Sequence, residues 1–234
     1  MTKEEKQKIR ERIWKLMEEK NIARFPLPLY GRIPNFVGSE EAAERIRELE
    51  EWEKAKVIKI NPDSPQRRIR ELVLKENKTL IMATPRLKEG FLILKNLQKI
   101  AHEASSIKGA FKHGKKIGIN ELPKVDLIVT GSVAVTEDGA RVGKSSGYGD
   151  LEYAISKELR IVDENTPRVT NVHEIQIVSY IPMEKHDVPV DYIITPKRII
   201  RTNTKYHKPR GIYWEMITEE MLNEIPILKE LKPK

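Results

Sequence analysis

The most informative stretch of this sequence reads DGARVGKSSGYGD, from Asp138 to Asp150, and it holds four of the twelve glycines in the chain. Two apolar runs typical of strands, 125–130 and 132–135, precede it, and residues 151–159 follow with the apolar spacing of a helix. A strand, a glycine-rich basic loop and a helix start together bind phosphate groups in many proteins. Glycine lets backbone N–H groups approach an anion, and Arg141 and Lys144 add two positive charges. The alternative is an ordinary tight connection with solvated basic side chains.

The composition indicates a globular protein, since 39% of the 234 residues are hydrophobic and 33% are charged. No apolar run reaches the roughly 18 residues of a membrane span, and the first six residues contain no apolar signal core. We therefore expect a cytoplasmic protein with no membrane contact. The absence of cysteine excludes disulfides and thiol nucleophiles. Together with heavy use of Lys, Arg and Glu, it favours a heat-adapted protein.

The net charge of +8 is compatible with two kinds of partner, a nucleic acid or a polyanionic small molecule such as a nucleotide. Most charged runs mix both signs, as solvated helix faces do, and only 112–116 and 197–201 are locally basic. Neither basic segment alternates with aromatic residues that could stack on bases. We expect nucleic-acid binding to be absent, or weak, sequence-independent and lost as salt rises.

Helical and strand-like segments alternate along the chain. Expected helices cover 2–20, 39–52, a segment that begins at Pro65, 91–101, a segment after Asp150 and the tail from Trp214. Expected strands cover 55–60, 80–83, 125–130, 132–136, 168–172, 192–195 and 198–201. Residues 102–120 are expected to be irregular, and 175–180 fit a helix or a strand equally well.

This alternation predicts one α/β domain over residues 1–234, a Rossmann-like three-layer sandwich around a mainly parallel sheet. Residues 24–38 carry three prolines and are expected to form an irregular, extended arm. A helical extension is expected from about residue 209. Ligands of such sheets bind at the carboxyl ends of the strands, which is where the loop after Val135 falls.

The pattern Arg141-x-Gly143-x-x-x-Gly147-Tyr148-x-Asp150 resembles the nucleotide loop of the 5-formyltetrahydrofolate cyclo-ligases, also called methenyltetrahydrofolate synthetases. That loop reads Arg-Leu-Gly-x-Gly-x-Gly-Tyr-Tyr-Asp in the family. The resemblance implies the cyclo-ligase and CoA-transferase-like version of the α/β fold.

Other segments carry the same resemblance over roughly residues 1–200. Lys6 and Arg10 match an N-terminal Lys-x-x-x-Arg that touches ATP phosphates in the family. Residues 186–191, His-Asp-Val-Pro-Val-Asp, resemble a late family segment, with Gln176 before it where the family has a glutamine. The segment 24–36 is similar to that of a divergent, cyclo-ligase-like branch.

The resemblance implies an ATP-dependent ligase that converts 5-formyltetrahydrofolate to 5,10-methenyltetrahydrofolate and releases ADP and phosphate. Its implied partners are ATP or ADP, Mg²⁺ and a folate or related small molecule. The implied nucleotide contacts are Lys6, Arg10, Arg141, Gly143, Lys144, Ser145, Ser146, Gly147 and Tyr148. Arg141 and Tyr148 would also act in catalysis, and Asp150 and Asp187 would hold Mg²⁺.

Each implied role has a plainer alternative. Asp150 could cap a helix, and Asp187 and Asp191 could form turns around Pro189. Tyr148 could be an ordinary packed loop tyrosine. The pair Lys6 and Arg10 lies on one helix face, which solvated charges also do.

Four departures from the family pattern bear on activity, and they affect the substrate side more than nucleotide binding. Ser145 replaces the second loop glycine, Gly149 replaces the second tyrosine, and Leu151 stands where active members often have arginine. Residues 58–70 lack the folate-binding glutamate of the family and hold only Asp63. We therefore expect poor or redirected cyclo-ligase activity. The alternatives are a nucleotide-binding relative without turnover and a non-specific nucleic-acid-binding protein.

Overall fold

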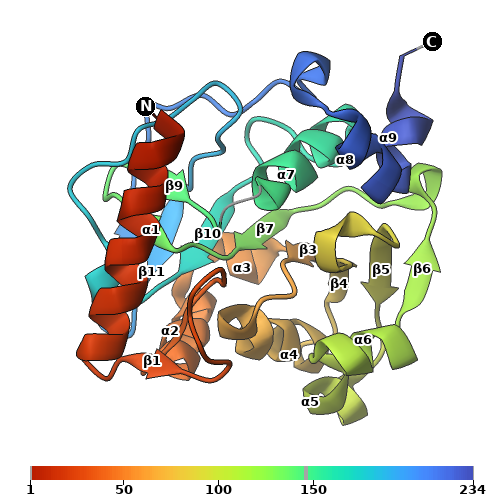
Figure 1. The fold of residues 1–234 in the computed structure, drawn as a ribbon. Coiled ribbons are helices and arrows are strands. Elements are labelled where there is room, and N and C mark those ends of the chain that lie inside the picture. The colour runs from red at the N-terminus through yellow and green to blue at the C-terminus, as the bar shows by residue number, and fades with distance from the viewer. Residues whose placement is uncertain (1, 145–146, 234) are drawn as a thin grey trace.

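The computed structural model describes residues 2–144 and 147–233. Its main strands are β3 (Val57–Ile60), β4 (Thr79–Ala83), β5 (Phe91–Leu94), β6 (Lys115–Ile117), β7 (Leu127–Thr130), β10 (Arg168–Asn171), β11 (Tyr192–Ile194) and β12 (Ile199–Arg201). Within the described residues they form one sheet of eight strands in the order β12-β11-β10-β7-β3-β4-β5-β6 (Figure 1). The five strands from β11 to β4 are parallel, and the outer strands are antiparallel to their neighbours.

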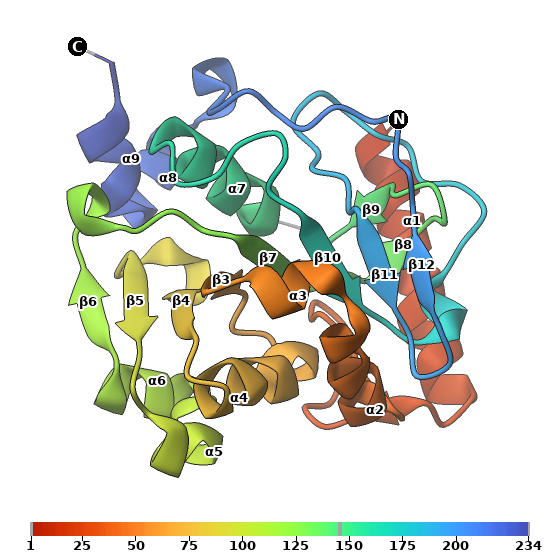
Figure 2. The same cartoon turned by 180° about the vertical axis from the view of Figure 1, so that it is seen from behind.

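Helices cover both faces of this sheet. They are α1 (Thr2–Glu19), α2 (Ser39–Glu44), α3 (Glu50–Lys54), α4 (Arg67–Lys75), α5 (Ala101–Ala104), α6 (Ile107–His113), α7 (Tyr148–Glu158), α8 (Glu219–Glu224) and α9 (Pro226–Leu231). Figures 1 and 2 show α4, α5 and α6 on one face and α7, α8 and α9 on the other. The expected three-layer α/β fold around a mainly parallel sheet is confirmed.

Side-chain alternation along the strands separates two apolar cores. In β4, Leu80 and Met82 belong to the core beneath α1, α2 and α4, whereas Ile81 and Ala83 belong to the core beneath α7 and the C-terminal helices. In β3, Ile58 and Ile60 face the first core. Period-two alternation therefore directs the intervening residue, Lys59, toward α7.

The strand order reverses between β3 and β7. The chain passes from β3 to β4 on one side and later returns to place β7 on the other side of β3. Crossover connections on either side of such a point leave a crevice outside the carboxyl ends of the strands, where ligands bind. Residues 61–64 and Gly131 follow β3 and β7 directly and therefore lie at this crevice.

Two expectations for the middle of the chain are wrong. Residues 91–101 do not form one helix, because Phe91–Leu94 is strand β5, paired with β4 and β6, and only a short 3₁₀ turn and the start of α5 follow. Residues 102–120 are not irregular, since they contain the rest of α5, all of α6 and β6. An apolar run of four residues fits either a strand or a buried helix turn, and tertiary pairing decides between them.

The helix after the glycine loop begins at Tyr148, three residues earlier than expected. Gly147 occupies its N-cap with a left-handed φ of 66°, a conformation that favours glycine. Asp150 therefore lies in the first turn of α7, and the interpretation of this residue as a helix cap is wrong.

The arm at 24–38 is largely irregular, as expected, apart from the two-residue strands β1 (Ala23–Arg24) and β2 (Asn35–Phe36). Its anchor Leu29 is fully buried, and the indole of Trp14 donates a hydrogen bond to the carbonyl of Arg32. Among the described residues, no helix combines the length and apolarity that crossing a bilayer requires.

The C-terminal part of the chain forms a 3₁₀ turn at Trp214–Met216 and the helices α8 and α9, which pack against the body of the domain. Thr218 caps α8 with its side chain, and Leu222, Ile225 and Leu228 are buried in the core that also contains Tyr153 of α7. A Tyr148–Glu224 hydrogen bond of 2.9 Å joins α8 to the glycine-loop region.

Candidate functional site

A cavity of about 910 Å³ opens at the carboxyl ends of the central strands. Residues after β3 (61–64), after β4 (84–87) and after β7 (Gly131) line it, as the strand-order reversal predicts. The remaining walls come from helix α1, the arm, the glycine-loop region, the start of α7, Ile107, Met216 and the three residues Glu184, His186 and Asp187. Its volume lies near the upper end of the roughly 300–1,000 Å³ typical of small-molecule sites.

All four cationic residues expected at a phosphate site line this one cavity. They are Lys6, Arg10, Arg141 and Lys144, accompanied by the backbone of Gly143 and Gly147. Tyr148, Asp150 and Asp187 also line it. Ser145 and Ser146 lie outside the described residues. The assigned roles of these residues stay predictions.

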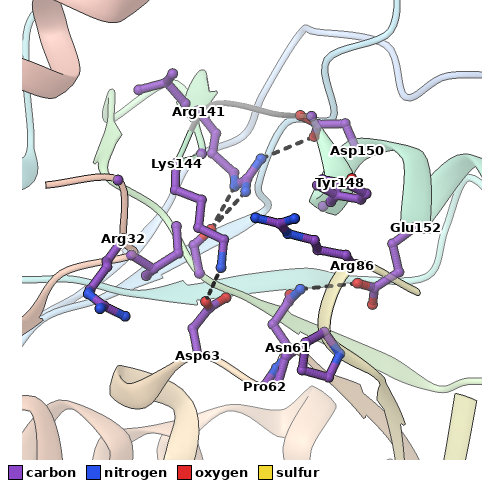
Figure 3. Close-up of a pocket in the computed structure, with 18 of the residues that line it drawn as sticks. Arg32, Asn61, Pro62, Asp63, Arg86, Arg141, Lys144, Tyr148, Asp150 and Glu152 are labelled. Carbon is purple, nitrogen blue, oxygen red and sulfur yellow. Dashed lines mark hydrogen bonds and ion pairs between the residues drawn. The ribbon is translucent and has the colours of Figure 1, made fainter. Parts of the chain in front are cut away.

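Arg141 is held in place by its neighbours. It follows β8 (Ala134–Val135) and opens β9 (Arg141–Val142), which pairs with it. Its Nε and Nη2 atoms donate to the Gly131 carbonyl at 3.1 and 2.8 Å, and Nη1 lies 3.1 Å from Asp150 Oδ1 (Figure 3). These bonds fix the plane of the guanidinium. Among the described residues these are the hydrogen bonds of the group, so one donor on each of Nη1 and Nη2 is left for a ligand, because an arginine has five N–H groups.

Two glycines make room for this guanidinium. A Cβ atom at Gly143 would lie 2.9 Å from Arg141 Nη2, and one at Gly149 would lie 3.2 Å from the same atom. The cyclo-ligase loop pattern has a second tyrosine at the position of Gly149. A glycine there leaves room for the closely packed Arg141 side chain.

Arg10 of α1 reaches the same loop. Its Nε atom donates to the Gly143 carbonyl at 2.7 Å, and its Nη1 atom donates to Gln7. Burial, followed by the nearby charge of Arg141, lowers the pKa of Arg10. The two guanidinium groups repel each other, so an anion placed between them would be stabilised.

Lys6 lies at a small acidic cluster. Its Nζ atom is 2.5 Å from Asp187 and 2.9 Å from Glu184, and His186 Nε2 lies 3.8 Å from Asp187. The hydrogen bond from Lys6 lowers the pKa of Glu184. Asp187 also accepts the backbone N–H of Glu184 at 2.7 Å, so it forms a turn as well as an ion pair. The ligand atoms of Glu184, His186 and Asp187 lie within 4.8 Å of one another.

Asp150 is surrounded by cations. Its Oδ1 atom lies 3.1 Å from Arg141 and 3.6 Å from Arg168, and it accepts the Val188 N–H at 3.2 Å. Arg168 is buried, and burial lowers its pKa to about 10. Sequence reasoning missed Arg168, because an arginine in an expected strand gives no signal of where it points.

Lys144 and Tyr148 are each tied to another segment. Lys144 Nζ lies 2.8 Å from Asp63 Oδ1, which links the glycine loop to the turn after β3 (Figure 3). The Tyr148 hydroxyl donates to Glu224 of α8. Burial and then this hydrogen bond raise the pKa of Tyr148.

The floor of the cavity contains an ion pair that sequence reasoning did not find. Lys59 of β3 is paired with Glu152 of α7, and Asn61 Nδ2 donates to the same carboxylate at 3.2 Å. Burial lowers the pKa of Lys59, against the influence of Glu152. Glu152 lines the cavity, so a buried carboxylate faces the carboxyl end of β3, although residues 58–70 contain no glutamate.

Comparison with known proteins agrees with the family resemblance seen in the sequence. The sequence profile of the 5-formyltetrahydrofolate cyclo-ligase family matches residues 2–196. The chain belongs to this family. The match ends before the C-terminal helices.

Two vertebrate relatives of the cyclo-ligase family align along nearly the whole chain. A methenyltetrahydrofolate synthase domain-containing protein of Bos taurus is 44% identical over 235 residues, which is 97% of this chain and 62% of the relative. The protein of the same name from Homo sapiens is 43% identical over 237 residues, or 98% and 62% of the two chains. This chain thus spans about 62% of the length of these relatives.

The solved structure of the 5,10-methenyltetrahydrofolate synthetase of Aquifex aeolicus has the same fold. It aligns with a TM-score of 0.54 and 22% sequence identity, over 86% of this chain and 94% of the other.

Proposed function

We propose that this chain is an ATP-dependent ligase that closes 5-formyltetrahydrofolate, or a closely related formyl compound, to its cyclic methenyl product. The observation that carries the proposal is the convergence of Lys6, Arg10 and Arg141 on one cavity at the strand-order reversal. These cations come from segments more than 130 residues apart in the sequence. Membership of the cyclo-ligase family supports the same reaction.

The proposed chemistry needs orientation and charge neutralisation more than acid–base groups. The formyl oxygen attacks the γ-phosphorus of ATP, and ADP leaves. The neighbouring amine then closes on the activated carbon, and the carbon–oxygen bond to phosphate breaks. Arg10, Arg141 and Lys144 would neutralise the phosphate oxygens, and the backbone at Gly143 and Gly147 would let them approach closely.

Mg²⁺ is part of the proposal as the counter-ion of the nucleotide, where it would neutralise phosphate charge. The oxygen-rich set of Glu184 and Asp187, with His186 beside it, fits a divalent cation in donor chemistry. Asp150 fits less well, since its Oδ1 atom already faces two guanidinium groups. Lys6 would have to exchange its carboxylate partners for phosphate when the nucleotide binds.

Two substitutions on α1 test the nucleotide half of the proposal. Arg10→Gln should weaken magnesium-dependent ATP binding about tenfold, the usual effect of one lost charge-assisted hydrogen bond. Arg12→Gln is the matched control, because Arg12 lies on the same helix but is exposed and outside the cavity. Calorimetry of both variants gives the answer, and equal affinities would remove Arg10 from the nucleotide site.

Turnover is tested by following the absorbance of methenyltetrahydrofolate with ATP, Mg²⁺ and 5-formyltetrahydrofolate. We expect a specificity constant below about 10⁴ M⁻¹s⁻¹, the lower end for typical enzymes, because Gly149 and the missing glutamate alter the substrate side. A higher value would show that these departures are harmless. If the chain binds the nucleotide but does not turn over this substrate, the result would instead support the alternative hypothesis, a nucleotide-binding member of the family without cyclo-ligase activity.

A further inference from the structure

Arg86 differs from the other arginines of the cavity, because its side chain has no hydrogen-bond or ion-pair partner among the described residues. Arg10, Arg32 and Arg141 each donate a hydrogen bond to a backbone carbonyl. Arg86 also lines the cavity, and its exposed side chain extends into it (Figure 3). Within residues 2–144 and 147–233, no hydrogen bond or ion pair engages its guanidinium.

The backbone at Arg86 is unfavourable for an arginine. Arg86 has φ 55° and ψ 22°, and the next residue, Leu87, has φ 56°. Residues with a Cβ atom rarely adopt this left-handed region, and such positions gather at functional sites. The surrounding turn is well anchored, since Leu87 is buried and the Thr84 hydroxyl contacts both Glu89 and Gly90. The fold thus maintains a costly conformation that directs Arg86 into the cavity.

Arg86 also comes from a different part of the fold than the arginines proposed to bind phosphate. It follows β4, whereas Arg10 comes from α1 and Arg141 opens β9. Glu152, Asp63 and Asp150 on the nearby walls already have cationic partners among the described residues. The guanidinium of Arg86 therefore remains available to an anionic group of a ligand. A single planar guanidinium with a free edge matches one carboxylate through two parallel hydrogen bonds.

We propose that Arg86 binds a carboxylate of the second substrate at the β4 end of the cavity, apart from the nucleotide phosphates. The inference rests on the proposed function, because it assumes that a nucleotide and a carboxylate-bearing compound share the cavity. It assigns Arg86 to substrate selection. The other anion that could reach Arg86 is the terminal phosphate of the nucleotide, and the experiment separates the two sources.

The test measures equilibrium binding of two probes, 5-formyltetrahydrofolate and the primary amide of 5-formyltetrahydropteroate, which has the same rings but a neutral amide in place of the glutamate and therefore no carboxylate. Both are titrated in the presence of a non-hydrolysable ATP analogue and Mg²⁺. We expect the wild-type protein to prefer the carboxylate-bearing probe about tenfold, as one charge-assisted contact allows. Arg86→Gln should abolish this preference, and Arg86→Lys should keep part of it. Lys88→Gln, on the same loop but outside the cavity, should behave as wild type.

Three results overturn the inference. They are equal loss of both probes in Arg86→Gln, weaker binding of the ATP analogue in that variant, and a wild-type protein that does not distinguish the probes. Probe binding with the expected preference but without turnover supports the role of Arg86 and contradicts the proposed reaction. A wild-type protein that binds neither probe contradicts both.

Arg86→Gly separates function from stability. Glycine accepts the left-handed backbone without strain, so this variant should keep the melting temperature of the wild type while losing the probe preference. A clear fall in melting temperature would show that Arg86 is retained for stability and would count against its role in binding.

Discussion

Lys59, in the middle of β3, is ion-paired with Glu152 of α7, and both side chains are almost completely buried. The pair joins the sheet to α7 directly beneath the cavity. Two charges in such a place are stable only while each has its partner, since an uncompensated buried charge is strongly destabilising. The pair therefore links the stability of the domain to the shape of the cavity floor.

Lys59→Met should lower the free energy of unfolding by about 3–5 kcal/mol, because Glu152 is left buried without its cation. The double variant Lys59→Met/Glu152→Leu should recover most of that loss. Urea unfolding measures both, with Lys54→Gln as the control on an exposed helix pair with Glu50. A double variant as unstable as the single one would show that packing, and not charge, sets the cost.

Gly143→Ala should weaken nucleotide binding about tenfold with little change in stability. The new methyl group would stand 2.9 Å from Arg141 Nη2 and would push the guanidinium out of its plane. Gly118→Ala is the control, since its nearest neighbour is the far end of the Glu121 side chain, outside the cavity. Calorimetric titration with ATP and Mg²⁺ decides the matter, and unchanged affinity in Gly143→Ala would separate Arg141 from nucleotide binding.

Glu71 should contribute to acid sensitivity. Burial raises the pKa of Glu71, but hydrogen bonds from Lys75, Arg68 and His102 outweigh burial and lower it from 4.5 to about 2. A carboxylate with a depressed folded-state pKa stabilises the protein fully above pH 4.5, and its contribution is lost as the pH falls toward 2. Glu71→Gln should therefore cost about 2 kcal/mol at neutral pH.

The measurement is urea unfolding at several pH values between 2 and 7. The variant should show a shallower decline over pH 4.5 to 2 than the wild type, with the exposed Glu53→Gln as control. Parallel curves for wild type and Glu71→Gln would exclude Glu71 from the acid response.

Ile225→Ala should lower the free energy of unfolding by about 2–4 kcal/mol, because Ile225 is fully buried between the C-terminal helices and the second core. Val37→Ala, at a 40% exposed position, should have little effect. A single unfolding transition that shifts as a whole in Ile225→Ala would show that the C-terminal extension and the body unfold together. An unchanged transition would mean that the extension is a dispensable tail.

The alternating pattern of the sequence was enough to predict the parallel strands of the sheet, its helical layers and the position of a cavity at the carboxyl ends of the strands, but not the edge strands β5 and β6. It failed at Phe91–Leu94, where a four-residue apolar run fits two structures and only pairing with β4 and β6 selects one. The local spacing of glycines and basic residues was enough to predict that the glycine loop borders this cavity. The Lys59–Glu152 pair could not, because its members are 93 positions apart and Lys59 reads as an interruption of an apolar strand.

Arg86 shows a second reason why sequence reasoning was incomplete. The segment 84–87, Thr-Pro-Arg-Leu, reads as an ordinary proline turn. Its left-handed backbone, which directs the arginine into the cavity, is set by the burial of Leu87 and the hydrogen bonds of Thr84. Such tertiary constraints leave no local pattern in the sequence.

The cavity walls run from Lys3 to Met216, so nearly the full length of the chain must be folded before the site exists. A compound that binds only the assembled cavity therefore stabilises the whole molecule, by about 2.7 kcal/mol at a hundred times its dissociation constant. A rise in melting temperature therefore reports that a compound has bound the cavity, even when the reaction is unknown. A melting-temperature screen of nucleotides and reduced folates, singly and in pairs, could find the natural ligands even where no product forms.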